Sequence, residues 1–338
     1  MKILVVRLDH LGDLLLTTPL VRALSIAGHA VDVLVRESLQ PVFDRSPYVE
    51  ECYAVEQVAP SFPGKWWQLS RWLRSTRHDA VILAYARESR LCLASAFSGS
   101  PRRIAMWAGA WGRLTGHECL PSHMLDNPRP VSEILLSCSR ALGASDQGIK
   151  PDFFLGEEEV SSWRALLPAG LQGRPLIGIH PGSAGNACNL PSAIYGQVAE
   201  QLLRETDCGL LVTGTPNETN LLSSWPIPVL ESERVWQTMG KLDLRQLAAA
   251  IAEMKVYVCS STGPLHIASA VSTRTVSPFC PAVPLNAAIW GNVGAPAIVL
   301  EPQTCPRRSG KTACCDFGGQ ISARQVATEV CSFLATGT

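Results

Sequence analysis

A short apolar run, a polar turn and a helical pattern follow one another at the start of the chain. Residues 3–6 (ILVV) are long enough for a buried strand and too short to cross a membrane. Residues 14–24 predict a helix that begins at Asp13, and a strand followed by a helix forms the first unit of a parallel sheet. Ligands bind at the carboxyl ends of such strands, which makes Asp9, His10 and Asp13 candidate site residues. The alternative is that Asp13 only caps the helix.

Strand-like and helix-like segments continue to alternate along the chain. This pattern predicts an α/β fold with doubly wound parallel sheets. A length of 338 residues is enough for about two domains. We place them at 1–155 and 156–338, with a central cleft between them. The predicted strands are 31–35, 80–84, 176–180, 209–213 and 256–259, and the predicted helices are 66–77, 132–142, 193–204, 244–253, 264–271 and 322–334.

Charge and composition narrow the possible partners. The 29 basic and 29 acidic residues give a formal net charge of zero, which argues against nucleic acid as a partner. Charged residues interrupt the N-terminal apolar segment, and no uncharged apolar run is long enough for a membrane span. The sequence therefore predicts a cytoplasmic protein. Twelve cysteines scattered along a chain of this length predict reduced thiols rather than a disulfide framework.

Residues 60–113 combine positive charge with tryptophan. This segment contains nine basic residues, two acidic residues and five of the nine tryptophans. Such a mixture suits a phosphorylated or glycosylated acceptor, or the headgroup region of a membrane. The alternative is a solvated basic face over a tryptophan-rich core. Arg102 and Arg103 are the basic residues that we select as candidates for acceptor binding.

Three turns in the second half follow predicted strands and suit a nucleotide. Residues 180–185 (HPGSAG) are small, so their backbone N–H groups can approach an anion closely. In residues 214–218 (GTPNE), Glu218 can accept hydrogen bonds from a ribose diol, or it can be an ordinary surface residue. Residues 260–266 (SSTGPLH) place hydroxyls and glycine at the start of a helix, which suits a diphosphate.

Several familiar motifs are absent or incomplete. Neither G-x-G-x-x-G after the first strand nor G-x-x-x-x-G-K-[ST] occurs, which argues against a nicotinamide-dependent enzyme and a P-loop ATPase. Cys305, Cys314 and Cys315 lie near one another in the sequence, but without a C-x-x-C pair or a nearby histidine. We therefore predict no metal site there.

The motifs in their order resemble glycosyltransferase family 9, the heptosyltransferases of lipopolysaccharide core assembly. The matching stretches are ILVVRLDHLGDLLLTTPLVRAL, HPGS, GTPNE, GKLDLRQLAAAI and SSTGPLHIASAV, and the resemblance runs from residue 1 to about 335. It implies a GT-B architecture, in which the first Rossmann-like domain binds the acceptor and the second binds a nucleotide sugar. It also implies that the C-terminal helix, 322–334, packs back on the first domain.

The resemblance assigns roles to individual residues. Asp13 matches the proposed general base of an inverting single displacement that needs no metal cofactor. The implied donor is ADP-heptose, with another nucleotide sugar as the alternative. The implied acceptor is a lipid-linked or phosphorylated glycan, bound with the help of His10, Arg102 and Arg103 at the cytoplasmic face of the inner membrane. The residues expected to bind the donor are Ser183, Glu218, Ser261, Thr262, Gly263, Pro264 and His266.

Two positions depart from the family pattern. Cys188 stands where many members have a cation that touches the donor phosphate, and Ser261 stands where an acidic residue is common. Arg7 is the residue that we expect to replace the missing cation. The loss of a cation at Cys188 leaves a second function class open, namely a catalytically silent scaffold or sensor that binds a nucleotide sugar. His266 can orient the diphosphate loop or have a purely structural role.

Overall fold

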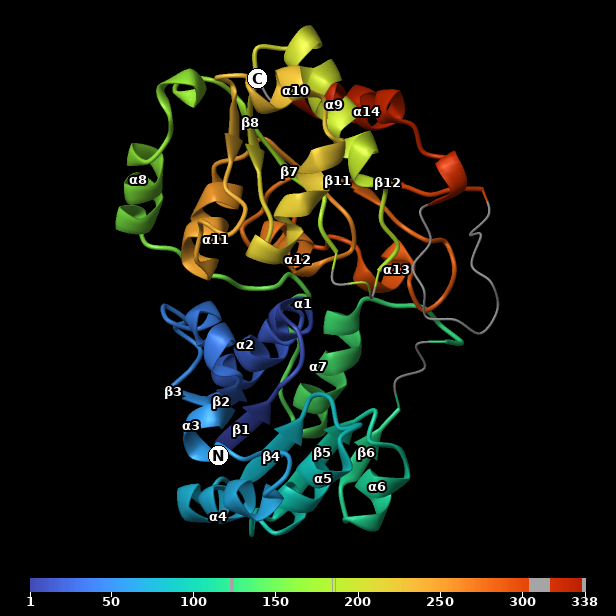
Figure 1. Ribbon diagram of the computed structural model, residues 1–338. Helices are drawn as coiled ribbons and strands as arrows, with labels where there is room; N and C mark the ends of the chain where they lie inside the picture. The colour runs from blue at the N-terminus through green and yellow to red at the C-terminus, as the bar shows by residue number, and fades with distance from the viewer. Residues whose placement is uncertain (122–124, 184, 186, 304–316, 336–338) are drawn as a thin grey trace. The chain divides into compact units, whose positions relative to one another are not determined.

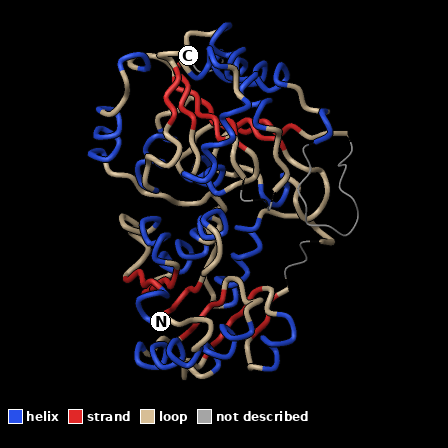
Figure 2. The backbone as a smooth tube through the Cα atoms, in the orientation of Figure 1, coloured by secondary structure: helices blue, strands red, loops and turns tan. Residues whose placement is uncertain are grey.

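The computed structural model describes residues 1–121, 125–183, 185, 187–303 and 317–335 (Figure 1). Contacts divide the chain into two compact units, Met1–Phe154 and Leu155–Thr338. This division falls one residue before the boundary expected from the sequence. Each unit contains one six-stranded parallel sheet with helices around it, as Figure 2 shows by colour.

The first sheet has the strand order β3-β2-β1-β4-β5-β6, and every neighbouring pair is parallel. Because the chain moves outward from β1 to β3 and then returns to β4, the strand order reverses between β1 and β4. Open α/β sheets bind ligands outside the carboxyl ends of the strands at such a point. The strands are β1 (Lys2–Val6), β2 (Ala30–Val35), β3 (Glu51–Ala54), β4 (Ala80–Leu83), β5 (Arg102–Met106) and β6 (Glu118–Leu120).

The apolar sequence of β1 reflects its central position. Ile3, Leu4, Val5 and Val6 are all nearly inaccessible to solvent, as expected for a strand covered on both faces. Among the helices around this sheet, α2 packs against α7 and α4 packs against α5. The helical segments are α1 (Leu11–Leu15), α2 (Thr18–Ile26), the 3₁₀ helix η1 (Glu37–Val42), α3 (Val55–Val58), α4 (Trp66–Thr76), α5 (Ser89–Ala96), α6 (Gly109–Leu114) and α7 (Val131–Ala141).

The helix expected at 14–24 is two helices, α1 and α2. Pro19 lies in the first turn of α2, where its missing N–H is tolerated, and the Thr17 hydroxyl donates to the Asp13 carbonyl at the junction. Asp13 therefore lies inside α1, whose N-cap residue is His10. The alternative that Asp13 acts only as a helix cap is wrong, because its carboxylate bonds to Arg7 instead.

The second sheet has the order β12-β11-β10-β7-β8-β9, again with parallel pairs throughout. Its strand order reverses between β7 and β10. The strands are β7 (Leu176–His180), β8 (Gly209–Val212), β9 (Val235–Gln237), β10 (Val256–Cys259), β11 (Thr275–Pro278) and β12 (Ala297–Leu300). The helical segments are α8 (Glu157–Ala165), η2 (Ala169–Leu171), α9 (Ser192–Glu205), η3 (Pro216–Ser224), α10 (Ile227–Leu230), α11 (Leu244–Ala252), α12 (Gly263–Ala270), α13 (Ala287–Trp290), η4 (Phe317–Gly319) and α14 (Ala323–Ala335).

The C-terminal helix α14 packs within the second unit. It lies beside α9 and also contacts β10 and β11 (Figure 1). Its apolar face, which includes Val326, Ala327 and Val330, is buried in the core that these strands share. The resemblance implied a position on the first domain instead. The difference has a simple reason, since an amphipathic helix joins the core that covers its apolar face.

The described helices contain none that is long and apolar enough to cross a membrane. None of the nine described cysteines is recorded in a disulfide, in line with the reduced thiols that the sequence predicts. The cluster Cys305, Cys314 and Cys315 lies outside the described residues.

A buried charge cluster lies between β2 and the start of β4. Asp32 and His78 have fully buried side chains, and His78 Nε2 lies 2.8 Å from Asp32 Oδ2. Lys2 Nζ lies 3.2 Å from the same oxygen. Burial opposes ionisation of Asp32, but the bonds to His78 and Lys2 outweigh it and lower the pKa of that carboxyl.

We expect Asp32→Asn to lower the free energy of unfolding at pH 7 by about 3 kcal/mol, because breaking a buried pair leaves its partners uncompensated. The depressed pKa of Asp32 means that its stabilising effect is complete above the unfolded value and disappears as the pH falls through the folded value. The difference between the two proteins in urea denaturation should therefore shrink below about pH 4.

Asp146→Asn is the matched control, because Asp146 forms an exposed pair with Arg140. We expect a loss below about 1 kcal/mol for that variant. Equal losses for the two variants would show that the Asp32 cluster is not a buried network.

Candidate functional site

Arg7 organises the carboxyl end of β1. Its side chain is 2% exposed, and its Nη1 donates to the Ala84 carbonyl at the end of β4 over 2.9 Å. Its Nε lies 2.6 Å from Asp9 Oδ1, and its Nη2 donates to Asp13 Oδ1 over 2.6 Å. One guanidinium therefore joins the two strands at the point of reversal and orients two carboxylates.

Asp13 is a carboxylate with a perturbed proton affinity. Burial raises its pKa above the ordinary value of 3.8, the charge of Arg7 opposes this shift, and the charge of Asp9 adds to it. The side chain is 19% exposed, which leaves it open to a small reacting group. A carboxylate whose pKa is raised toward neutrality and that retains access to solvent suits general base catalysis.

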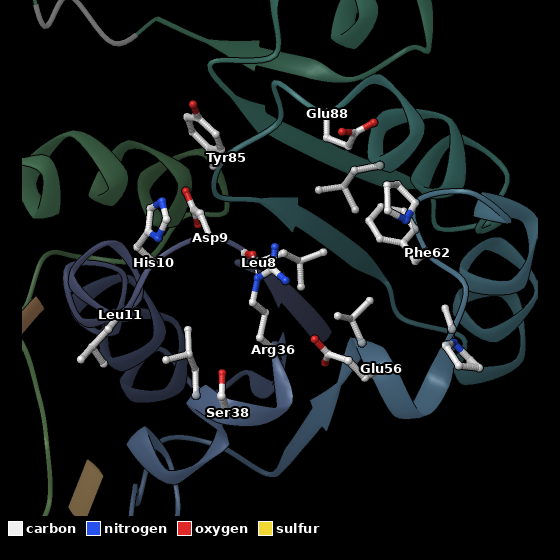
Figure 3. A pocket seen from close by; sticks show the side chains of 16 residues that line it. Leu8, Asp9, His10, Leu11, Arg36, Ser38, Glu56, Phe62, Tyr85 and Glu88 are labelled. Atoms are coloured by element: carbon white, nitrogen blue, oxygen red, sulfur yellow. Dashed lines mark hydrogen bonds between the residues drawn. The ribbon is translucent and has the colours of Figure 1, made fainter. Parts of the chain in front are cut away.

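A cavity of about 560 Å³ lies in the first unit beside Asp9 and His10. Figure 3 shows that Asp9, His10 and Tyr85 lie together on one side of it, with Arg36, Ser38 and Glu56 on another. The guanidinium of Arg7 lies 5.3 Å from the centre of the Tyr85 ring, so the cavity adjoins the Arg7 cluster. The residues that line it are Leu8, Asp9, His10, Leu11, Arg36, Ser38, Leu39, Val55, Glu56, Ala59, Pro60, Phe62, Pro63, Tyr85, Glu88 and Leu91.

In the second unit the turns after β7 and β8 meet at Glu218. Its Oε2 accepts hydrogen bonds from the backbone N–H and the hydroxyl of Thr215, each over 2.8 Å. A Cβ added to Gly182 would lie 2.1 Å from Glu218 Oε1, so the carboxylate packs directly over the glycine of the HPGS turn. The structure therefore brings together two of the three turns that the sequence indicates.

A buried hydrogen-bond chain supports these turns. His180 Nδ1 lies 3.0 Å from the Thr213 hydroxyl, which lies 2.7 Å from the Tyr257 hydroxyl. Burial lowers the pKa of His180, although the nearby Glu218 opposes this shift. The imidazole is therefore neutral and serves to fix the ends of β7, β8 and β10. Sequence reasoning did not assign His180 a function of its own.

The third turn leads into α12. Thr262 is its N-cap residue and Gly263 and Pro264 form its first turn, with Ser261 directly before them; all four are partly exposed. Ser260 Oγ, just before them, is buried without a hydrogen-bond partner among the described residues. Backbone N–H groups at the start of a helix favour an anion. β10 lies next to β7 in the sheet, so this turn is at the same edge as the other two.

His266 and Ser183 stabilise the elements on which they lie. His266 is 3% exposed, burial lowers its pKa to about 4, and its ring packs edge-on against Trp290. It is therefore neutral and supports α12 rather than titrating. Ser183 Oγ accepts from the backbone N–H of Gly185 over 3.2 Å, which shapes the HPGS turn.

The structure corrects the expectations for Cys188 and Arg7. Cys188 is 4% exposed and lies in the apolar core of the second unit, so its side chain is not at a surface that a phosphate reaches. Arg7 bonds to Asp9, Asp13 and Ala84 within the first unit. Its charge is balanced there, which makes it a poor replacement for a phosphate-binding cation.

Arg102 and Arg103 do not join the site. They lie at the start of β5, at the edge of the sheet opposite Asp13. Arg102 donates to Glu118 and to the Ala141 carbonyl, and Arg103 donates to the Ser100 carbonyl. The sequence indicated them because basic residues are frequent in that segment. This frequency does not show at which end of a strand a residue lies. Only His10 of the three candidates for acceptor binding lines the cavity.

Sequence reasoning missed five side chains that line the cavity. A positional rule could have found them, because each follows a strand of the first sheet in the chain. Polar residues just after the strands of a parallel sheet gather at its carboxyl edge. The missed polar residues are Arg36 and Ser38 after β2, Glu56 after β3, and Tyr85 and Glu88 after β4.

Comparison with known proteins identifies the family. The model of glycosyltransferase family 9 (heptosyltransferase) matches residues 66–309, well over half of the chain. The chain belongs to glycosyltransferase family 9. Lipopolysaccharide heptosyltransferase 2 of Escherichia coli K12 is 24% identical to this family 9 chain over 298 residues, which cover 84% of each protein.

Solved structures confirm the GT-B fold of this family 9 member. A family 9 glycosyltransferase from Veillonella parvula has a TM-score of 0.81 and 22% identity, and the match covers 99% of this chain and 97% of the other. The Escherichia coli ADP-heptose lipopolysaccharide heptosyltransferase II has a TM-score of 0.79 and 21% identity, with 99% of each chain covered. The chain is thus a glycosyltransferase with two Rossmann-like units.

The contact between Gly182 and Glu218 gives a test of the second-unit site in this family 9 enzyme. We expect Gly182→Ala to displace the Glu218 carboxylate and weaken nucleoside diphosphate binding about tenfold, the effect of losing a charged hydrogen bond. Glu218→Gln should have a similar effect. Titration with ADP and UDP measures the dissociation constants.

The double variant distinguishes a shared mechanism from two separate ones. If Gly182→Ala acts through Glu218, the double variant binds no more weakly than Glu218→Gln alone. Additive losses would show that Gly182 matters independently of the carboxylate. The melting temperature should change little in each case, because the displaced atoms end a flexible side chain.

Proposed function

We propose that the protein transfers a heptose from a nucleoside diphosphate heptose to a lipopolysaccharide-type glycan, with Asp13 as the general base. The single observation that supports this best is the Asp13 carboxylate, which burial makes more basic and which Arg7 holds at the carboxyl end of β1. Membership in glycosyltransferase family 9 establishes the reaction class, and its heptosyltransferase relatives favour a heptose donor.

The proposed reaction is a single displacement with inversion. An acceptor hydroxyl gives its proton to Asp13 while its oxygen forms a bond to the anomeric carbon of the sugar. The bond from that carbon to the diphosphate oxygen breaks at the same time, and its electron pair leaves with the nucleoside diphosphate. A base of raised pKa takes up the proton more readily than an ordinary carboxylate.

The second unit supplies groups suited to the leaving diphosphate. In the proposal, the backbone N–H of Gly263 and the partial positive charge at the start of α12 face the developing negative charge. Ser183 and Thr262 assist, and Glu218 accepts hydrogen bonds from the ribose. ADP is the proposed nucleotide, in line with the ADP-heptose enzyme of similar fold. We propose that no metal ion takes part.

The proposal also includes contact between the first unit and a membrane surface that carries the acceptor. Trp67, Trp111 and Leu114 are between 49% and 77% exposed on α4 and α6, and Arg71 and Arg113 are exposed on the same helices. Exposed aromatic and basic side chains of this kind suit the headgroup region of an anionic bilayer. We propose peripheral contact there. Membership in glycosyltransferase family 9 disfavours the silent-scaffold alternative.

Asp13→Asn tests the base directly. Asparagine keeps the size of the side chain and can still accept from Arg7, but it cannot take up a proton. We expect kcat/KM for heptose transfer to fall by about 10²–10⁴, the usual contribution of a general base. The shift in melting temperature caused by ADP should stay the same, since Asp13 belongs to the other unit.

Asp79→Asn is the matched control, because this exposed carboxylate lies before β4, at the opposite edge of the sheet. It should retain wild-type activity. Near-normal transfer by Asp13→Asn would remove Asp13 as the base. Absence of transfer from any heptose donor to any glycan acceptor in the wild-type enzyme would overturn the proposed function itself.

The pH dependence of the reaction gives a second test. Activity requires ionised Asp13, so the acid limb of the kcat/KM profile should lie above the ordinary carboxyl pKa of 3.8. Asp9→Asn removes a negative charge that raises this pKa and frees Arg7 to stabilise the ionised form. The limb should therefore move to lower pH in the variant. A limb that stays in place or moves upward would contradict the assignment.

A further inference from the structure

The cavity in the first unit has an unexpected charge for a family 9 acceptor site that was expected to bind phosphate. Its ionisable lining residues are Asp9, His10, Arg36, Glu56 and Glu88. Three of the five are carboxylates, and Arg36 is the one arginine among the residues that line it. The basic residues selected from the sequence, Arg102 and Arg103, lie at the other edge of the sheet.

The two glutamates are held in place at the cavity. Glu56 Oε2 accepts from the backbone N–H of Glu37 over 2.9 Å. Glu88 is the N-cap residue of α5, and its Oε1 accepts from the Arg90 N–H over 3.3 Å. Both donors are uncharged backbone N–H groups, so these hydrogen bonds bring no positive charge to either carboxylate. Figure 3 shows Glu88 on one side of the cavity and Glu56 on another.

Arg7, Arg36 and Arg87 lie at or beside the cavity, and the guanidinium of Arg87 lies 6.0 Å from the centre of the Tyr85 ring. Arg7 is 2% exposed and balances Asp9 and Asp13. Arg36 is exposed and donates its Nε to the Leu8 carbonyl over 2.5 Å; this acceptor is uncharged, so the positive charge of Arg36 offsets one of the three lining carboxylates. A phosphate monoester brings about 1.5 to 2 negative charges, and it would meet two fixed carboxylates there. Both glutamates are exposed to solvent, which weakens the repulsion, but like charges at short range still disfavour binding.

The remaining lining suits a neutral sugar. Phe62, Pro60, Pro63 and Leu91 form an apolar wall on which the C–H face of a sugar ring can pack. Carboxylate oxygens accept hydrogen bonds from hydroxyl groups, two at a time where the hydroxyls are adjacent. The hydroxyl of Tyr85 adds a donor and acceptor next to the Arg7 cluster. The apolar residues therefore suit the C–H face of an uncharged sugar, and the carboxylates suit its hydroxyl groups.

We infer that this pocket binds an unphosphorylated sugar of the acceptor glycan and discriminates against the phosphorylated form through Glu56 and Glu88. The inference rests on the proposed function for the identity of the pocket as the acceptor site. It narrows the acceptor from the phosphorylated or lipid-linked glycan expected from the sequence. Phe62 provides affinity without charge selectivity, and the two glutamates provide selectivity.

The test compares two forms of one heptose-terminated core oligosaccharide, before and after removal of its phosphate groups. Binding to the ADP-saturated full-length protein is measured by calorimetry, and transfer is measured as kcat/KM with saturating donor. We expect the dephosphorylated form to bind and react at least about tenfold better. Tighter binding of the phosphorylated form by wild-type protein would overturn the inference.

Three variants separate selectivity from affinity. Glu56→Gln/Glu88→Gln keeps the backbone hydrogen bonds but removes both charges, so the preference should fall to near unity through better binding of the phosphorylated form. Phe62→Ala should weaken both forms equally. Glu50→Gln removes an exposed charge just before β3, at the opposite edge of the sheet, and should leave the preference unchanged. An unchanged preference in the double variant would also overturn the inference.

The two readouts distinguish this inference from the proposed function. Selective binding of the neutral oligosaccharide without any transfer would retain the pocket assignment and overturn the heptosyl transfer. Transfer with a preference for the phosphorylated acceptor would retain the proposed function and overturn the pocket assignment. Absence of binding by both forms would overturn the pocket assignment as well.

Discussion

The buried guanidinium of Arg7 is the interaction on which the first unit's chemistry depends. An unpaired charge at 2% exposure would be costly, so the fold has to surround it with acceptors. The Ala84 carbonyl provides one at the end of β4, and Asp9 and Asp13 provide the others. The contacts that stabilise Arg7 thus also fix the position of the proposed base. They also join β1 and β4, between which the strand order reverses.

The parallel sheets explain why the candidate groups gather as they do. Strands buried on both faces carry mainly apolar side chains, and the candidate reactive residues of the first unit follow the last residue of a strand. In the first unit these residues surround Arg7 and the cavity. In the second unit the turns after β7, β8 and β10 lie at one edge, with His180, Thr213 and Tyr257 bonded beneath them.

Much of this arrangement could be predicted from the sequence, and the exceptions have physical causes. The apolar runs at 3–6 and 176–180 and the turns after them identified the sheets, and the family resemblance was confirmed. Arg102 and Arg103 were wrongly selected because an excess of basic residues in a segment does not show where each side chain lies in the fold. Both residues begin β5, so they lie at the amino edge of the sheet and not at the carboxyl edge. The roles of Glu56 and Glu88 could not be predicted, because they depend on three different strands ending around one space. The position of α14 was not predicted, because an apolar pattern shows that one face of a helix is buried but not which domain buries it.

Glu218 illustrates how a local folding motif can set the conditions for recognition. Thr215 already donates two hydrogen bonds to Oε2, and the missing side chain of Gly182 leaves the space that the carboxylate occupies. The side chain therefore loses its rotational freedom when the loop folds, not when a ligand arrives. A ribose that binds there meets a rigid template with only Oε1 left to accept from it. In the proposed role both hydroxyls of a ribose diol would donate to Oε1, so a sugar that lacks one of them would lose a hydrogen bond that the restrained carboxylate could not replace.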